Sequence, residues 1–265
     1  MTEPRLPPAP AAVAARDRLI VALDLDTPSE NEALVRHLGA AASFYKVGWI
    51  SLAAGGFALV PALIEQGKQV FLDLKIFDVP NTVRQSIAAV ARLGVRFVTV
   101  HGNRAIVEAA VSGRGGSALE ILAVTVLTSL TGDDAREMYG LPDGTTLDDH
   151  VVSVTRSLVA LGADGVIASA EEVARLRAAV PARTTIVTPG IRLAGEATHD
   201  QRRVGAPDDA IAAGADYLVV GRSIYRNADP IAQVERYVDA IERGLAARER
   251  GARGPGERPA SRPQP

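Results

Sequence analysis

The chain has no cysteine, and only four of its 265 residues are histidines. Without cysteine there can be no disulfide bonds and no thiolate metal ligands. The histidines stand at positions 37, 101, 150 and 199, without the spacing of a metal site. The sequence therefore predicts neither a disulfide-stabilised fold nor a metal centre.

Long apolar runs and a large excess of one charge are also missing. No segment approaches the roughly 18 uninterrupted apolar residues of a membrane span, and the amino terminus MTEPRLPPAPAAVAARD has no continuous apolar stretch like that of a signal peptide. The formal net charge is −2, which gives no electrostatic reason to expect nucleic acid or a membrane surface as a partner. We therefore expect a cytoplasmic protein with a small soluble substrate.

Both ends of the chain differ in composition from the middle. Residues 1–16 are rich in proline, and residues 248–265 combine arginine, glycine and proline with almost no apolar side chains. Such segments bury too little apolar surface to fold, so both are predicted to be disordered extensions. Residues 17–247 have the length of one (β/α)8 barrel and are predicted to form a single catalytic domain.

Within this domain, short β-branched apolar runs alternate with amphipathic stretches of helical period. Strands are predicted at 18–25, 43–47, 69–75, 96–101, 119–126, 164–168, 184–188 and 216–220. Helices are predicted at 29–38, 58–66, 81–93, 104–112, 148–161, 171–179 and 230–246, and glycines 39, 67, 94 and 162 stand as C-terminal stops. Eight alternating units favour an α/β fold with a single closed TIM barrel. A doubly wound open sheet is the alternative, disfavoured because no G-x-G-x-x-G follows the first strand.

Polar or turn-forming residues end most of the predicted strands. They are Asp24, Lys46, Asp73, Lys75, His101, Thr128, the turn 188–190 and the pair Gly221–Arg222. In a TIM barrel the active site lies at the carboxyl ends of the strands. The pattern therefore predicts an active site there, although each residue alone also has an ordinary structural explanation.

The densest group of these residues lies in DLKIFDVPNT. Strand side chains alternate between faces, so Asp73 and Lys75 should both point into the barrel if Leu72 and Leu74 pack outward. Taken alone, the two could be an ordinary buried ion pair.

Two further charges extend the pair to a Lys–Asp–Lys–Asp set. With Lys46 and Asp78 added, the four alternating charges can sum to zero and still fix an ammonium group beside a reacting carbon. Asp78 lies beyond the strand end, just before Pro80, so its side chain should project from the rim, where it can serve a neighbouring subunit.

The last predicted strand ends in an anion-binding pattern. Gly221 lets backbone N–H groups approach an anion closely, and Arg222 adds a forked, permanently charged donor. Phosphate sites commonly follow strands 7 and 8 of such barrels. The long polar segment 190–207 could close over this site as a lid.

The chain resembles the decarboxylase branch of the orotidine monophosphate decarboxylase superfamily, in its bacterial form. The block FLDLKIFDVPNTV carries the superfamily signature D-x-K-x-x-D. Six more motifs occur in the same order over some 210 residues: VALD at 21–24, YKVG at 45–48, VTVLTSL at 124–130, VTPGIR at 187–192, HDQRR at 199–203 and VVGRSIYRNADP at 219–230.

The resemblance implies conversion of orotidine 5′-monophosphate to UMP and CO2, the final step of de novo pyrimidine nucleotide synthesis, without a metal or other cofactor. It implies that Lys75 is the proton donor and that Lys46, Asp73 and Asp78 complete the charged network. It further implies a homodimer in which Asp78 and Thr82 cross the interface to the partner's site.

The resemblance also assigns the substrate contacts. Asp24 and Lys46 would hold the ribose hydroxyls, with Thr82 and the backbone near Val79 reaching in from the second subunit. The remaining contacts would be Thr128 on the pyrimidine and Arg192, Gln201, Gly221 and Arg222 at the phosphate.

The residue chemistry fits this reaction. Loss of CO2 from C6 leaves a carbanion that cannot delocalise into a neighbouring carbonyl, so its stabilisation must be electrostatic. A fixed ammonium at Lys75 can offset that charge and then deliver the proton.

One position departs from the family pattern. Phe77 stands where histidine is common, and we expect it to change packing or the subunit interface rather than activity. Trp49, just after the second predicted strand, is expected to pack beneath the following loop.

Two other functions have to be weighed. Keto-gulonate phosphate decarboxylases and hexulose-phosphate synthases share D-x-K-x-x-D but use Mg²⁺, and they need a carboxylate near the end of strand 2, where this chain has Lys46. A non-catalytic phosphate-binding barrel is the other alternative, disfavoured because binding alone does not justify burying four charges.

Overall fold

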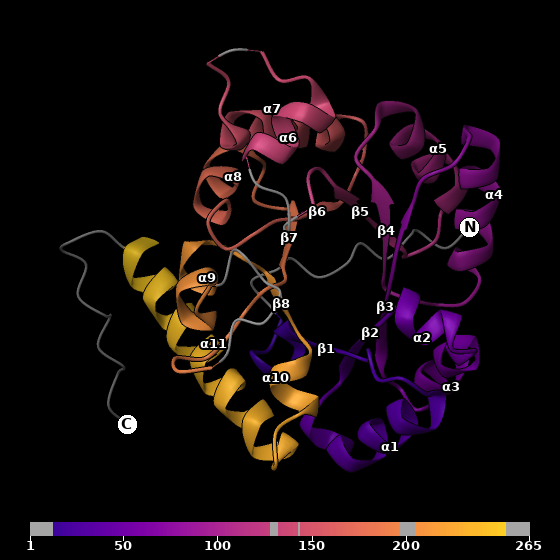
Figure 1. The fold of residues 1–265 in the computed structure, drawn as a ribbon, viewed down its shortest axis with the longest axis vertical. Helices are drawn as coiled ribbons and strands as arrows, with labels where there is room; N and C mark the ends of the chain where they lie inside the picture. The colour runs from indigo at the N-terminus through magenta and orange to yellow at the C-terminus, as the bar shows by residue number, and fades with distance from the viewer. Residues whose placement is uncertain (1–12, 128–131, 143, 197–204, 253–265) are drawn as a thin grey trace, which may run out of the picture.

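The computed structural model describes residues 13–127, 132–142, 144–196 and 205–252. Eight parallel strands form a closed barrel in chain order, and helices surround it on all sides (Figure 1). The strands are β1 Leu19–Ala22, β2 Phe44–Gly48, β3 Gln69–Ile76, β4 Phe97–His101, β5 Glu120–Val124, β6 Gly165–Ile167, β7 Thr185–Thr188 and β8 Tyr217–Val220. Because β1 also pairs with β8, with Leu19 opposite Leu218, the predicted TIM barrel is confirmed and the open sheet is excluded.

The helices follow the strands as the sequence pattern indicates. In the described ranges the α-helices are α1 Pro28–Leu38, α2 Trp49–Ala53, α3 Leu59–Glu65, α4 Pro80–Ala91, α5 Arg104–Arg114, α6 Gly132–Tyr139, α7 Leu147–Ala160, α8 Val173–Ala179, α9 Pro207–Ala213, α10 Arg222–Tyr225 and α11 Pro230–Ala252. Short 3-10 helices cover Arg16–Arg18, Gly39–Ala41 and Gly56–Ala58.

Local sequence signals set the helix ends. Helix α1 begins with a capping box, in which Thr27 accepts from the backbone N–H of Glu30 and the Glu30 carboxylate accepts from that of Thr27. The four predicted glycine stops all have positive φ, from 49° at Gly39 to 99° at Gly162. A residue with a Cβ would be strained in that conformation, which explains glycine at these positions.

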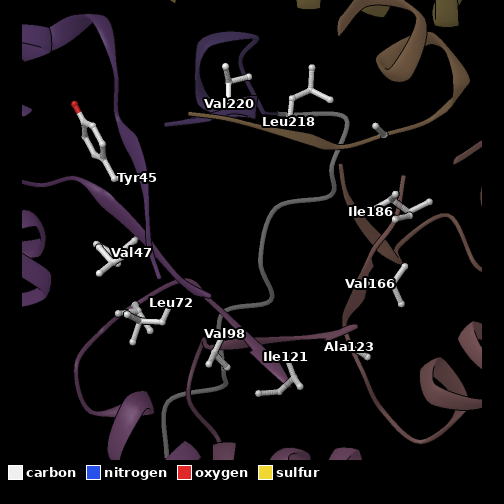
Figure 2. Packing of buried hydrophobic residues seen from close by; sticks show 14 of the residues in the cluster. Tyr45, Val47, Leu72, Val98, Ile121, Ala123, Val166, Ile186, Leu218 and Val220 are labelled. Atoms are coloured by element: carbon white, nitrogen blue, oxygen red, sulfur yellow. The ribbon is translucent and has the colours of Figure 1, made fainter. Parts of the chain in front are cut away.

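Alternation along the strands builds two apolar layers. Side chains on the outer face pack against the helices, and Figure 2 shows ten of them pointing away from the barrel: Tyr45, Val47, Leu72, Val98, Ile121, Ala123, Val166, Ile186, Leu218 and Val220. The inner face forms a second cluster that includes Ala22, Phe44, Phe71, Phe97, Val124 and Val219. At the carboxyl ends of the strands, members of this cluster such as Ala22, Val124 and Val219 border the cavity that forms the site.

At the amino ends of the strands, Arg96 and the side chains around it close the barrel beneath the inner cluster, and we call this group the Arg96 floor. The Arg96 guanidinium lies 4.9 Å from the ring centre of Phe97 and 5.0 Å from that of Tyr217. It donates to Gln69 at 2.5 Å and to the Tyr217 hydroxyl, and its Nε lies 3.6 Å from Glu120 Oε1. Cation–π contacts and an ion pair thus fill this end of the barrel.

The predicted element bounds need three corrections. Helices α2, α6, α9 and α10, each of eight residues or fewer, lie outside the predicted ranges, because so few residues carry little periodicity. Helix α11 continues to Ala252, so residues 248–252 are helical rather than part of a disordered tail. Arg16, assigned to the amino-terminal extension, instead forms an ion pair with Glu235 of α11 at 2.8 Å.

No helix in the described ranges is long and apolar enough to cross a membrane.

Candidate active site

A cavity of about 260 Å³ opens at the carboxyl ends of the strands. Charged side chains from β1 to β3 line one side, and arginines that follow β7 and β8 line another. Apolar residues at the ends of β5 and β6, namely Val124, Val126, Leu127 and Ile167, complete the wall. The cavity thus offers an apolar surface between two charged regions, which suits a planar ring joined to an anion.

Four charged side chains form a continuous row along the first region. Lys46 is buried, and its Nζ lies 3.0 Å from Asp24 Oδ1 and 3.9 Å from Asp73 Oδ2. The Nζ of Lys75 lies 2.7 Å from Asp73 Oδ1. Leu72 and Leu74 pack outward, so the condition for an inward Asp73 is met. The charges alternate along the row, so each buried charge has a partner of opposite sign.

Asp73 is the centre of this row. Burial would by itself raise the pKa of its carboxyl group, but the ammonium groups of Lys46 and Lys75 and hydrogen bonds from Lys75 and Thr99 outweigh it. The pKa of Asp73 therefore lies below its usual value, and the side chain stays ionised at neutral pH.

A backbone irregularity places Lys75. The register between β3 and β4 shifts between Leu72 and Ile76, and Lys75 is the one non-glycine residue with positive φ (47°) in the described part of the chain. Its backbone N–H donates to Thr99 Oγ1 at 3.0 Å, and the same hydroxyl donates to Asp73 Oδ1 at 2.9 Å. Thr99 is wholly buried on β4. Its hydroxyl therefore holds both the Asp73 carboxylate and the backbone of Lys75.

The opposite region of the cavity is basic. Arg192 is buried and its Nη1 donates to the Ile191 carbonyl at 2.7 Å, which fixes the guanidinium at the cavity wall. Gly221 precedes α10, and Arg222 begins that helix at the same wall. A Cβ added at Gly221 would make only an ordinary contact with Ala22 Cβ at 3.4 Å, and without that Cβ the Gly221 backbone lies open toward this wall. Two guanidinium groups and an open backbone segment can bind one phosphate.

The chain was compared with known proteins. The model of the "Orotidine 5'-phosphate decarboxylase / HUMPS family" matches residues 17–237. The orotidine 5'-phosphate decarboxylase of Bradyrhizobium diazoefficiens is 46% identical over 238 residues, which cover 90% of this chain and 99% of that protein. The protein of the same name from Methylobacterium nodulans is 48% identical over 237 residues, covering 88% and 98%.

The chain belongs to the orotidine 5'-phosphate decarboxylase / HUMPS family. Solved structures agree with this. The crystal structure of orotidine 5'-phosphate decarboxylase from Lactobacillus acidophilus has a TM-score of 0.74 at 34% identity and covers 85% of this chain and 99% of its own. That of orotidine 5'-phosphate decarboxylase from Pyrococcus horikoshii has a TM-score of 0.68 at 25% identity, covering 84% and 99%.

The structure brings together most of the site residues that the family resemblance assigned. Those lining the cavity are Asp24, Lys46, Asp73, Lys75, Arg192, Gly221 and Arg222. Three others, Asp78, Val79 and Thr82, are exposed on the rim, outside the cavity of their own chain. Thr128 and Gln201 lie outside the described residues.

Apart from the apolar wall, three residues at or beside the site were not predicted. Thr99 was missed because a single inward threonine in an apolar strand carries no motif. Tyr225 lines the cavity behind Arg222, and burial followed by the nearby charge of Asp24 raises the pKa of its phenol. Gly48 borders the charged row, because a Cβ there would stand 2.9 Å from Lys46 Nζ.

Two aromatic side chains lie on the rim beside β3. Trp49 is 63% exposed and donates through Nε1 to the Leu74 carbonyl at 2.9 Å, so the prediction that it packs beneath a loop is wrong. Phe77, at the position where the family pattern commonly has histidine, is 70% exposed and contacts the ring of His101 at 4.7 Å between centroids.

Within the described residues, no group of three or more His, Cys, Asp or Glu side chains is placed to hold a metal ion.

Proposed function

We propose that this protein decarboxylates orotidine 5′-monophosphate to UMP and CO2, the last step of de novo pyrimidine nucleotide synthesis in the cytoplasm. The observation that carries the proposal is the Lys75 ammonium, held 2.7 Å from Asp73 in a cavity whose other region presents Arg192 and Arg222. The relatives of that name, which align with nearly the whole chain, support it.

The reaction places the pyrimidine between the charged row and the apolar wall, with the phosphate at the arginines. The bond from C6 to the carboxylate breaks, CO2 leaves, and the electron pair stays on C6. The Lys75 ammonium stabilises this carbanion and donates a proton to it, and the resulting amine recovers a proton from solvent. Asp73 pairs with the ammonium group and directs it, while Asp24 and Lys46 bind the ribose hydroxyls.

The remaining contacts belong to the proposal as well. Thr128 would contact the pyrimidine, and Gln201 would join Arg192, Gly221 and Arg222 at the phosphate. No cofactor takes part in these steps.

The decisive assay follows the ultraviolet absorbance of orotidine 5′-monophosphate with purified protein in excess EDTA. Wild-type protein is expected to convert it to UMP, and Lys75→Ala is expected to lose turnover while still binding UMP, because the phosphate contacts remain. Conversion that requires added Mg²⁺ would favour the sister lyases, and UMP binding without any turnover would favour a binding barrel.

We further propose a homodimer in which Asp78, Val79 and Thr82 complete the partner's site. These residues are exposed, and Val79 joins Trp49, Ile50 and Phe77 in a group of exposed apolar side chains beside β3, which we call the β3 rim. Exposed apolar groups of this kind commonly mark protein contacts. Contact of two β3 rims around a twofold axis would bring each Asp78 toward the other cavity.

Mixing two inactive variants tests this arrangement. Lys75→Ala and Asp78→Asn chains, unfolded and refolded together, form hybrid dimers with one complete site if Asp78 crosses the interface. Random pairing then restores about a quarter of wild-type activity. If Lys75 and Asp78 act within one chain, the mixture stays inactive. Sedimentation of each variant alone provides the control for assembly.

A further inference from the structure

A carboxylate behind the cavity joins the segments that carry the two arginines. Glu196 Oε2 accepts from the backbone N–H of Leu193 at 3.1 Å, from Ser223 Oγ at 2.6 Å and from the Tyr237 hydroxyl at 2.9 Å. Its Oε1 accepts from Gln233 Nε2. Glu196 is not among the described residues that line the cavity.

Two of these donors follow the cavity arginines directly in sequence. Leu193 is the residue after Arg192, and Ser223 is the residue after Arg222. One carboxylate therefore fixes the chain next to each arginine. The segment with Arg192 follows β7, whereas Arg222 begins α10 after β8. Among the described residues the β7–β8 pairing extends to Thr188 and Leu218, so the link joins two segments beyond the end of that ladder.

The other two donors anchor the carboxylate to a long helix. Gln233 and Tyr237 are both buried on α11, which spans 23 residues. The Ser223 hydroxyl also lies 2.8 Å from the Tyr237 hydroxyl and accepts from Gln233 Nε2 at 3.0 Å. Helix α10 has only four residues and cannot hold a fixed position by its own hydrogen bonds. The burial of Ile224 in the core and the Glu196 network together fix that position.

We infer that Glu196 is a positioning residue for the substrate phosphate. By holding Leu193 and Ser223, it sets the separation at which the Arg192 and Arg222 guanidinium groups meet one phosphate. The inference rests on the proposed function, because it assumes that this region of the cavity receives the phosphate of a nucleotide. Glu196 itself does not touch the substrate.

The test compares ligands with and without the phosphate. Glu196→Gln keeps the size of the side chain and removes its charge, and Ser223→Ala removes only the hydroxyl that links the carboxylate to α10. For each variant, kcat/KM is measured with orotidine 5′-monophosphate and with orotidine, and Kd is measured by calorimetry for UMP and for uridine. Glu235→Gln is the control, because Glu235 lies on the same helix α11 but pairs with Arg16.

We expect both site variants to lower kcat/KM for the nucleotide by about tenfold to a hundredfold, as displaced binding groups typically do. UMP binding should weaken in step, while the values for orotidine and uridine stay within twofold and Glu235→Gln behaves like wild type. Equal losses with and without the phosphate would mean a merely structural role and would overturn the inference, as would unchanged values for both variants.

Failure of the proposed function is recognised separately. In that case wild-type protein itself does not convert orotidine 5′-monophosphate. Binding of inorganic phosphate, measured for wild type and both variants, then decides whether Glu196 positions the arginines, and equal affinities would refute it.

Discussion

Substitution of Thr99 tests directly how the side chains of the charged row are held in place. Its buried hydroxyl donates to Asp73 and accepts from the backbone N–H of Lys75. Thr99→Val has nearly the same shape and removes both bonds. A hydrogen bond to a charged group contributes about 1.5–3 kcal/mol, and a buried donor left without a partner costs about 1–3 kcal/mol.

The two losses overlap, so we expect a loss of about 2–4 kcal/mol in the free energy of unfolding, and Tm should fall by about 2–4 °C for each kcal/mol. Because Asp73 orients the Lys75 ammonium, we also expect kcat to fall by about tenfold to a hundredfold, on the scale of one factor of ten for each 1.4 kcal/mol. KM for orotidine 5′-monophosphate should stay within twofold, since the phosphate contacts are untouched.

Steady-state kinetics and thermal unfolding are measured together, with Thr99→Ser and Thr155→Val as comparisons. Thr99→Ser retains the hydroxyl and should recover most of kcat. Thr155 is equally buried on α7, but its hydroxyl has no hydrogen-bond partner among the described residues, so Thr155→Val should be neutral. The reasoning is refuted if Thr99→Val keeps full kcat, or if Thr99→Ser is as impaired as Thr99→Val.

Further predictions concern the same row and the phosphate region. Gly48→Ala should lower kcat/KM by about tenfold, because its Cβ would stand 2.9 Å from Lys46 Nζ. Its φ of −123° suits alanine, so Tm should stay near the wild-type value, and a large fall in Tm would contradict this account. Asp73 has a lowered pKa in the folded protein, so its contribution to stability is present above the unfolded pKa of about 3.9 and is lost as the pH falls through the lower folded value. Asp73→Asn should therefore lower Tm at pH 7, with a gap from wild type that narrows below about pH 4; a gap that stays constant in a pH series would argue against it. Arg222→Ala should weaken UMP binding and leave uridine binding unchanged, as calorimetry would show.

The fold could be predicted because its signals are repeated along the chain. Each strand is a short apolar run, and eight runs alternating with amphipathic helices favour one architecture. The short helices α2, α9 and α10 gave no such repetition. Helix α10, which carries Arg222, depends for its position on tertiary contacts with Glu196 and α11, and those cannot be derived from local sequence.

The charged row could be predicted in part for a similar reason. Strand alternation predicts that Asp73 and Lys75 point inward, and the motif YKVG supplies Lys46. The positive φ at Lys75 could not be foreseen, because lysine has no preference for that conformation. The role of Thr99 depends on the register shift between β3 and β4, which only the paired strands reveal.

The Arg96 floor has a consequence for how substrate enters and how products leave. The Arg96 guanidinium packs among aromatic rings and fills the amino end of the barrel, whereas the cavity in the described part of the chain opens at the carboxyl ends of the strands. Substrate must enter, and both CO2 and UMP must depart, through the same opening above the charged row. Substrate and UMP also occupy the same cavity, so UMP should act as a competitive inhibitor of orotidine 5′-monophosphate.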